Sequence, residues 1–131
     1  MASTTVKRFS KQRDCIMRVL SGTTSHPTAN WIYDKVREEI PNISLGTVYR
    51  NLSTLSNDGD ILRLTVGDGT EHYDACIKPH YHLWCKNCGG VYDIKVSYLD
   101  DLDLKAEKHS DVEIDCHRVM FYGTCSQCKN E

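Results

Sequence analysis

The sequence lacks any long apolar run. No stretch approaches the roughly 18 consecutive apolar residues of a membrane-spanning helix, and the N-terminus has no apolar signal segment. We therefore expect a cytoplasmic protein without a membrane partner. The sequence also lacks positive net charge: its formal charge is −2, which by itself is weak evidence against nucleic-acid binding.

The distribution of charge is more informative than its sum. Residues 74–131 hold seven Lys/Arg against ten Asp/Glu, whereas residues 1–20 have only one acidic residue, Asp14. The basic residues of that N-terminal segment are Lys7, Arg8, Lys11, Arg13 and Arg18. A basic end on a mildly acidic body is compatible with a DNA contact at that end, although basic N-termini are common.

Three segments before residue 58 have apolar residues at helical spacing. The first runs from Phe9 to Leu20, and the second starts at Pro27 and is stopped by Pro41. The third has Ser44 as its N-cap and reaches about Asn57. Its expected inward positions are Leu45, Val48, Leu52 and Leu55, and those of the second helix are Ala29, Ile32, Tyr33, Val36 and Ile40.

A β-hairpin follows these helices. Residues 61–66 and 70–73 alternate around the turn Gly67-Asp68-Gly69. Three helices and a hairpin are typical of a winged helix-turn-helix, whose third helix enters the major groove of DNA. The polar residues expected there are Thr47, Tyr49, Arg50 and Asn51, with the first three nearest the bases. A small helical subdomain with a solvated polar face fits the pattern equally well.

The predicted secondary structure changes after about Lys78, from mostly helices to mostly short strands. Tyr81–Cys85, Val91–Ile94 and Val112–Tyr122 are predicted strands, and Tyr98–Lys108 is a predicted acidic helix. About 50 residues make too small a core to stand alone. We therefore expect a metal, a partner chain, or both to stabilise this half.

Two Cys-x-x-Cys pairs among the seven cysteines supply a candidate metal site. They are Cys85/Cys88, followed by Gly89-Gly90, and Cys125/Cys128. A reducing cytosol disfavours disulfides, and two such turns complete a closed tetrahedral cage for structural zinc. A single pair would also fit a thioredoxin-like redox site, but the order of elements here does not favour that fold.

A second set of candidate ligands consists of imidazoles and carboxylates. His80 and His82 alternate, so they share one side of a strand, with Asp74 before them and Asp93 after them. His26 lies between the first two predicted helices. Three imidazoles and two carboxylates suit Fe(II), Mn(II) or Zn(II), although each residue taken singly is more often structural.

Several motifs together resemble the ferric uptake regulator family over nearly the full length, from Phe9 to Cys128. They are Ser25-His-Pro-Thr-Ala29, Ser44-Leu-Gly-Thr-Val-Tyr-Arg-Asn-Leu52, His80-Tyr-His82 and both cysteine pairs. The resemblance implies an α+β protein. Its parts would be a winged-helix DNA-binding domain over residues 1–73, a hinge over 74–80, and an α/β dimerisation and zinc-binding domain over 81–131.

The resemblance also implies a homodimeric repressor on palindromic operator DNA, switched on by a regulatory Fe(II) or Mn(II). The implied ligands are His26, Asp74, His80, His82 and Asp93. The two aspartates, together with Pro79 and Tyr81 where the iron-sensing branch has further ligands, resemble the peroxide-sensing branch. In that branch peroxide oxidises a ligand histidine through Fe(II), and the candidates here are His26 and His80.

Other functions also fit the sequence. An iron- or zinc-uptake repressor is the alternative within the family; a thiol oxidoreductase and a zinc-ribbon interaction module are alternatives outside it. Cys15, Cys76 and Cys116 are expected to be structural, with Cys15 in a helix core and Cys116 buried on a strand. Cys76 is near the regulatory ligands and could instead join a metal site or become oxidised. The other histidines, His72, His109 and His117, are expected at the surface or in hydrogen bonds.

Overall fold

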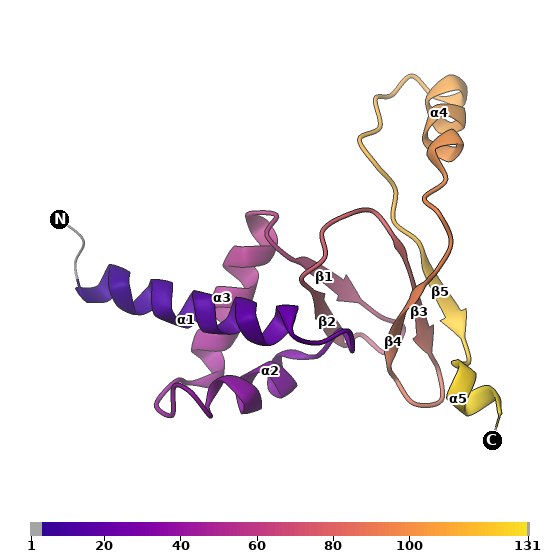
Figure 1. The fold of residues 1–131 in the computed structure, drawn as a ribbon. Helices are drawn as coiled ribbons and strands as arrows, with labels where there is room; N and C mark the ends of the chain where they lie inside the picture. The colour runs from indigo at the N-terminus through magenta and orange to yellow at the C-terminus, as the bar shows by residue number, and fades with distance from the viewer. Residues whose placement is uncertain (1–3, 131) are drawn as a thin grey trace. The chain divides into compact units, whose positions relative to one another are not determined.

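The computed structural model describes residues 4–130, with side chains from residue 11 onward. The side chains of Lys7, Arg8 and Phe9 therefore lie outside the described residues. The chain divides into two compact units, one ending at Ile77 and the other beginning at Lys78 (Figure 1). No helix in the described part of the chain is long and apolar enough to cross a membrane.

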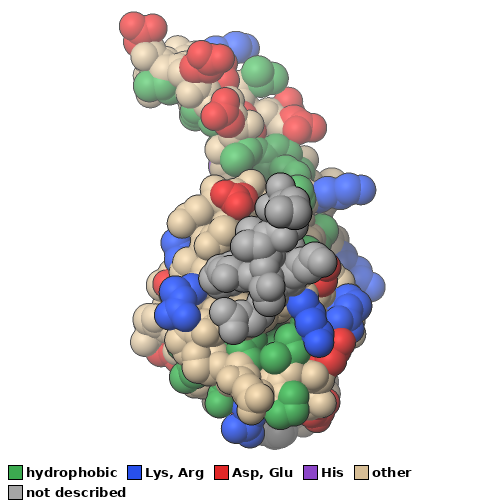
Figure 2. Space-filling model, turned by 90° about the vertical axis from the view of Figure 1, so that its left-hand side faces the viewer, with side chains coloured by type: hydrophobic (Ala, Val, Ile, Leu, Met, Phe, Trp, Pro, Cys, Tyr) green, Lys and Arg blue, Asp and Glu red, His purple; other side chains and the backbone are tan. Residues whose placement is uncertain are grey.

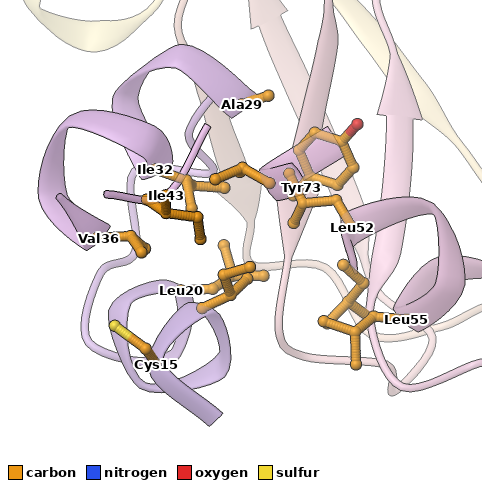
Figure 3. Close-up of a cluster of buried hydrophobic side chains, with 12 residues drawn as sticks. Cys15, Leu20, Ala29, Ile32, Val36, Ile43, Leu52, Leu55 and Tyr73 are labelled. Atoms are coloured by element: carbon orange, nitrogen blue, oxygen red, sulfur yellow. The ribbon is translucent and has the colours of Figure 1, made fainter. Parts of the chain in front are cut away.

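Three helices form most of the N-terminal unit: α1 (Thr4–Ser21), α2 (Ala29–Val36) and α3 (Leu45–Asn57). The hydroxyls of Thr28 and Ser44 cap α2 and α3 by accepting from the amides of Trp31 and Thr47. Their inward faces meet in one core with Tyr73 (Figure 3). The N-cap at Ser44 and the end at Asn57 confirm the prediction for α3.

Helix α2 is shorter than predicted. It ends at Val36, and the amides of Glu38 and Glu39 donate to carbonyls three residues back, at 3.2 and 3.0 Å. These tighter turns replace the last helical turn before Pro41, whose ring disfavours helical geometry at the preceding residue. Ile40 nevertheless packs against the core from this turn.

The predicted hairpin is present in the same unit. β1 (Leu62–Thr65) pairs antiparallel with β2 (Glu71–Asp74), with Leu64 opposite His72. In the connecting turn, the Asp68 carboxylate accepts from the Thr70 amide at 2.9 Å. Tyr73 of β2 is buried among the helices, so the hairpin is fixed to the core.

The C-terminal unit is a three-stranded sheet with two helices. Its elements are β3 (Tyr81–Cys85), β4 (Val91–Ile94), α4 (Asp100–His109), β5 (Met120–Gly123) and α5 (Ser126–Lys129). The strand order is β4-β3-β5, with β3 antiparallel to β4 and parallel to β5. α4 has no buried residue.

The predicted strand over residues 112–122 is wrong for its first eight residues. β5 begins only at Met120, which pairs with His82 near the start of β3. β3 begins at Tyr81, so the segment before Val119 has no β3 residue opposite it, and Val119 itself contributes one carbonyl that accepts from the His82 amide at 3.3 Å. Cys116 is in this segment and is exposed, which corrects the expectation that it would be buried on a strand.

Candidate functional site

The four cysteines of the two Cys-x-x-Cys pairs converge in the C-terminal unit. Their sulfur atoms all lie within 4.8 Å of one another, and Cys88 Sγ is 3.9 Å from Cys125 Sγ. Tetrahedral zinc with four sulfurs at about 2.3 Å requires sulfur–sulfur separations of about 3.8 Å. The observed arrangement therefore fits a closed zinc site without rearrangement of the strands.

Backbone amides favour the thiolate form at two of these cysteines by lowering the pKa of Cys85 and of Cys125, whereas the hydrogen bond with Cys125 raises the pKa of Cys128. The Cys125 amide donates to Cys85 Sγ at 3.3 Å, and this bond is the largest cause lowering the pKa of Cys85 to about 6. Gly89 has a φ of +75°, and a Cβ at Gly90 would lie 2.7 Å from the Tyr92 hydroxyl. The glycine pair therefore lets the chain turn closely around the sulfurs.

A histidine and an aspartate meet inside the N-terminal unit. His26 lies in the loop between α1 and α2, Asp74 ends β2, and His26 Nδ1 is 3.5 Å from Asp74 Oδ2. Both side chains are buried, with residue exposures of 3% and 5%. Buried imidazole and carboxylate groups are costly unless partnered, which makes this pair a candidate for binding a cation.

His72 is a residue of this site that the sequence analysis left among the unassigned histidines. Its Nδ1 donates to the backbone carbonyl of His26 at 2.7 Å, and the Tyr73 amide donates to the carbonyl of Pro27 at 2.9 Å. β2 therefore holds the loop that carries His26. The signal in the sequence is the alternation of His72 with Asp74, which places both on one side of the strand.

The remaining predicted regulatory ligands lie together in the C-terminal unit. Asp93 Oδ1 is 3.2 Å from His80 Nε2 and 3.5 Å from His82 Nε2. The strand register explains this, because His82 of β3 is opposite Asp93 of β4. The two imidazole rings have centroids 4.3 Å apart, so two imidazoles and one carboxylate of the predicted ligand set lie together.

His117, the third histidine of this unit with a defined environment, is held by other side chains. Its Nδ1 donates to Asp103 Oδ1 at 2.7 Å, and its Nε2 accepts from the Tyr81 hydroxyl at 2.7 Å. Tyr98 donates to the other oxygen of Asp103 and lowers the pKa of that carboxyl. Because both ring nitrogens have protein partners, His117 connects α4 to β3, which agrees with the prediction of a hydrogen-bonded histidine.

The polar residues predicted for DNA contact lie on α3. Arg50 Nη2 donates to Thr47 Oγ1 at 3.0 Å, and the Asn51 side-chain amide donates to the Thr47 carbonyl at 2.9 Å. Tyr49 and Arg50 are exposed, whereas Val48 and Leu52 are buried. The helix thus presents one polar side outside the core, as an element that reads a groove must.

The three cysteines outside the cluster differ in accessibility. Cys15 is fully buried in the N-terminal core, and its thiol donates to Glu39 at 3.1 Å. Burial is the largest cause raising the pKa of Cys15 to about 11, which makes this thiol unreactive. Cys76 is exposed, and its amide donates to Asp74 Oδ1 at 2.9 Å.

The C-terminal unit leaves many large apolar side chains uncovered. In Figure 2, hydrophobic side chains lie beside acidic ones at the top of the view, where Figure 1 places α4. The exposed residues of this unit include Val96, Leu99, Leu102, Leu104, Val112, Phe121 and Tyr122. These uncovered apolar side chains are candidates for contact with a partner chain.

Comparisons with known proteins match one family over most of the chain. The family model described as "Ferric uptake regulator family" matches residues 5–122. A peroxide-responsive repressor of Staphylococcus epidermidis is 38% identical over 124 residues, covering 95% of this chain and 83% of the relative. The Campylobacter jejuni peroxide stress regulator has a TM-score of 0.82 and 31% identity, covering 92% of this chain and 91% of that chain. FurB of M. tuberculosis, a zinc uptake regulator, has a TM-score of 0.56 and 30% identity, covering 97% and 99%.

Proposed function

This chain belongs to the ferric uptake regulator family, and we propose that it is a metal-dependent transcriptional repressor that senses peroxide. The observation that carries the proposal is the buried His26–Asp74 pair within the winged-helix unit. A metal-ligating pair inside a DNA-binding unit gives a bound ion direct influence on that unit. Relatives named as peroxide-responsive repressors support the same function.

The proposed partner is double-stranded operator DNA bound by a homodimer. The exposed polar side of α3 supports the DNA contact, with Thr47, Tyr49, Arg50 and Asn51 as the proposed contact residues. The uncovered apolar residues around α4 support pairing with a second copy of the chain. A twofold dimer presents two α3 helices, which fits a palindromic operator.

Structural zinc is the proposed occupant of the cysteine cluster. The four sulfurs offer the geometry that zinc requires, the pKa values of Cys85 and Cys125 are lowered toward the thiolate form, and four sulfur ligands leave no open coordination position. Its role would be to stabilise a unit whose own core is small. The family relationship, in which members are transcription regulators, favours this role over thiol catalysis.

The proposed regulatory ion is Fe(II) or Mn(II), held by His26, Asp74, His80, His82 and Asp93. The His26–Asp74 pair in one unit and the His80, His82 and Asp93 group in the other each support it separately. Neutral imidazoles and two carboxylates balance a divalent charge, so burial of the ion is not prohibitive. An ion that binds the DNA-competent state more tightly than other states shifts the population toward it.

Peroxide sensing would depend on the metal that is bound. Bound Fe(II) would supply the electron that reduces hydrogen peroxide, a reaction that Mn(II) would not support. His26 and His80 are the proposed oxidation sites. His26 belongs to the pair with Asp74, and His80 belongs to the group with Asp93, so each group of proposed ligands contributes one candidate imidazole. The nitrogen and oxygen donors leave the choice of metal to availability in the cell.

The test compares the Fe(II)-loaded and Mn(II)-loaded protein bound to a DNA duplex selected for tight binding. We expect peroxide to release the Fe(II) form only, with one added oxygen on His26 or His80 by peptide mass spectrometry. Equal release of both forms would contradict the mechanism. Release with oxidised Cys76 and intact histidines would favour a thiol-based sensor.

An uptake repressor is the second candidate function. The observation that favours it is the exposed thiol of Cys76 two residues after Asp74, because a thiolate would favour zinc at the regulatory site. The zinc uptake regulator at 30% identity is consistent with it. DNA binding activated by zinc and unaffected by peroxide would support this alternative.

A further inference from the structure

A polar cavity of about 550 Å³ lies at the beginning of α3. Its polar lining residues are Lys11, Gln12, Asn42, Ser44, Thr47 and Arg50. Two of these are cations, and no carboxylate is among the lining residues in the described part of the chain. The cavity therefore has the charge and the donor groups of an anion site.

The Arg50 side chain lies along the first turn of α3. Its guanidinium donates to Thr47 Oγ1 at 3.0 Å, and a Cβ built on Gly46 would lie 3.8 Å from Nη1. Ser44 Oγ is 2.8 Å from the same Thr47 hydroxyl. The guanidinium thus lies at the N-terminal end of α3, where the helix dipole also favours an anion.

Helix α1 contributes the other side of the cavity. Lys11 supplies a second cation, and Gln12 Oε1 is inaccessible to solvent without a hydrogen-bond partner among the described residues. Gln12 therefore forms part of the wall, and the donors that face the cavity are Lys11 on this side and Arg50 on the other. A ligand with several acceptor oxygens would satisfy these donors.

We propose that this cavity binds a backbone phosphate of the DNA duplex. The inference rests on the proposed function, since the ligand is part of the DNA that α3 contacts. It adds Lys11 to the DNA-binding residues, and it assigns Arg50 to a phosphate, whereas the sequence alone suggested a place nearest the bases. Contacts of this kind fix the position of the protein on the duplex without reading its sequence.

The experiment measures DNA affinity against salt concentration for the full-length, zinc-replete protein. Probes are a random-sequence duplex and a duplex selected for tight binding to the wild type, each with and without Mn(II). Lys11→Gln is compared with the control Lys35→Gln, an exposed lysine of α2 outside the cavity. Losing one phosphate contact should reduce the slope of log K against log salt by about 0.9 on both duplexes.

Arg50→Gln should behave in the same way as Lys11→Gln. Unchanged slopes for both variants, or loss confined to the selected duplex, would overturn the phosphate assignment. DNA binding that does not respond to Mn(II) would overturn the proposed function instead, and the random-duplex slopes would still test the cavity. A wild type that binds neither duplex would overturn both.

Discussion

His26 Nδ1 lies 3.5 Å from Asp74 Oδ2, across 48 residues of chain, in the unit that carries α3. His26 also has a φ of +50°, and it is the single non-glycine residue with positive φ among those described. Left-handed backbone at a non-glycine residue is uncommon and persists where the surroundings impose it. Here the hydrogen bond from His72 to the His26 carbonyl holds that conformation.

Replacing His26 should separate metal activation from folding. We expect His26→Asn to retain zinc and dimer but lose Mn(II)-activated DNA binding, because asparagine tolerates left-handed backbone without offering an imidazole. DNA affinity with and without Mn(II) measures this effect. His109→Asn, which replaces an exposed histidine, is the matched control and should behave as wild type. Unchanged activation in His26→Asn would remove His26 from the regulatory ligands.

Zinc should be required for the C-terminal unit to fold. Cys125→Ser should lose zinc, dimer and the circular-dichroism signal of the sheet, because structural zinc contributes about 10 kcal/mol or more, comparable with the whole stability of a domain. Cys116→Ser, at an exposed cysteine outside the cluster, should keep all three. A Cys125→Ser protein that remained a zinc-loaded dimer would contradict the structural role.

Thiol reactivity should distinguish the three cysteines outside the cluster. In the zinc-loaded protein, iodoacetamide should modify Cys76 and Cys116 rapidly, since both are exposed. Cys15 should react only on unfolding, because it is buried and its pKa is raised to about 11. Peptide mass spectrometry measures each rate, and the Cys15 rate in denaturant is the control. Fast labelling of Cys15 in the native state would contradict the packing of α1.

The ion pair between Arg18 and Glu39 should stabilise the N-terminal unit in a pH-dependent way. Arg18 donates two hydrogen bonds to Glu39, at 2.8 and 3.0 Å, and lowers the pKa of that carboxyl to about 2. A lowered pKa in the folded state gives stability that is complete above the unfolded value of about 4.3. That stability is lost as the pH falls toward 2.

Thermal unfolding from pH 6 to pH 2 measures this contribution. Glu39→Gln should lower the melting temperature at pH 6 more than at pH 2, and Glu38→Gln is the neighbouring charge control. Both partners are substantially exposed, so the difference should be small and should shrink in high salt. A deficit for Glu39→Gln that is equal at both pH values would contradict the ion-pair explanation.

Local spacing in the sequence determined the elements that depend on near neighbours. The hydroxyl of Ser44 and the apolar stripe of Val48, Leu52 and Leu55 define α3, because capping and helical periodicity act within a few residues. The two Cys-x-x-Cys pairs likewise predict a four-sulfur cluster, because the two thiols of each pair are only three residues apart in the sequence.

Only the tertiary structure decided what depends on distant contacts. The start of β5 at Met120 follows from the start of β3 at Tyr81, and the anchoring of His117 follows from Asp103 and Tyr81. The cavity that joins Lys11 to Arg50 exists because α1 packs near the beginning of α3. No periodicity encodes these relationships, because they arise when residues far apart in sequence are brought together by burial of a shared core.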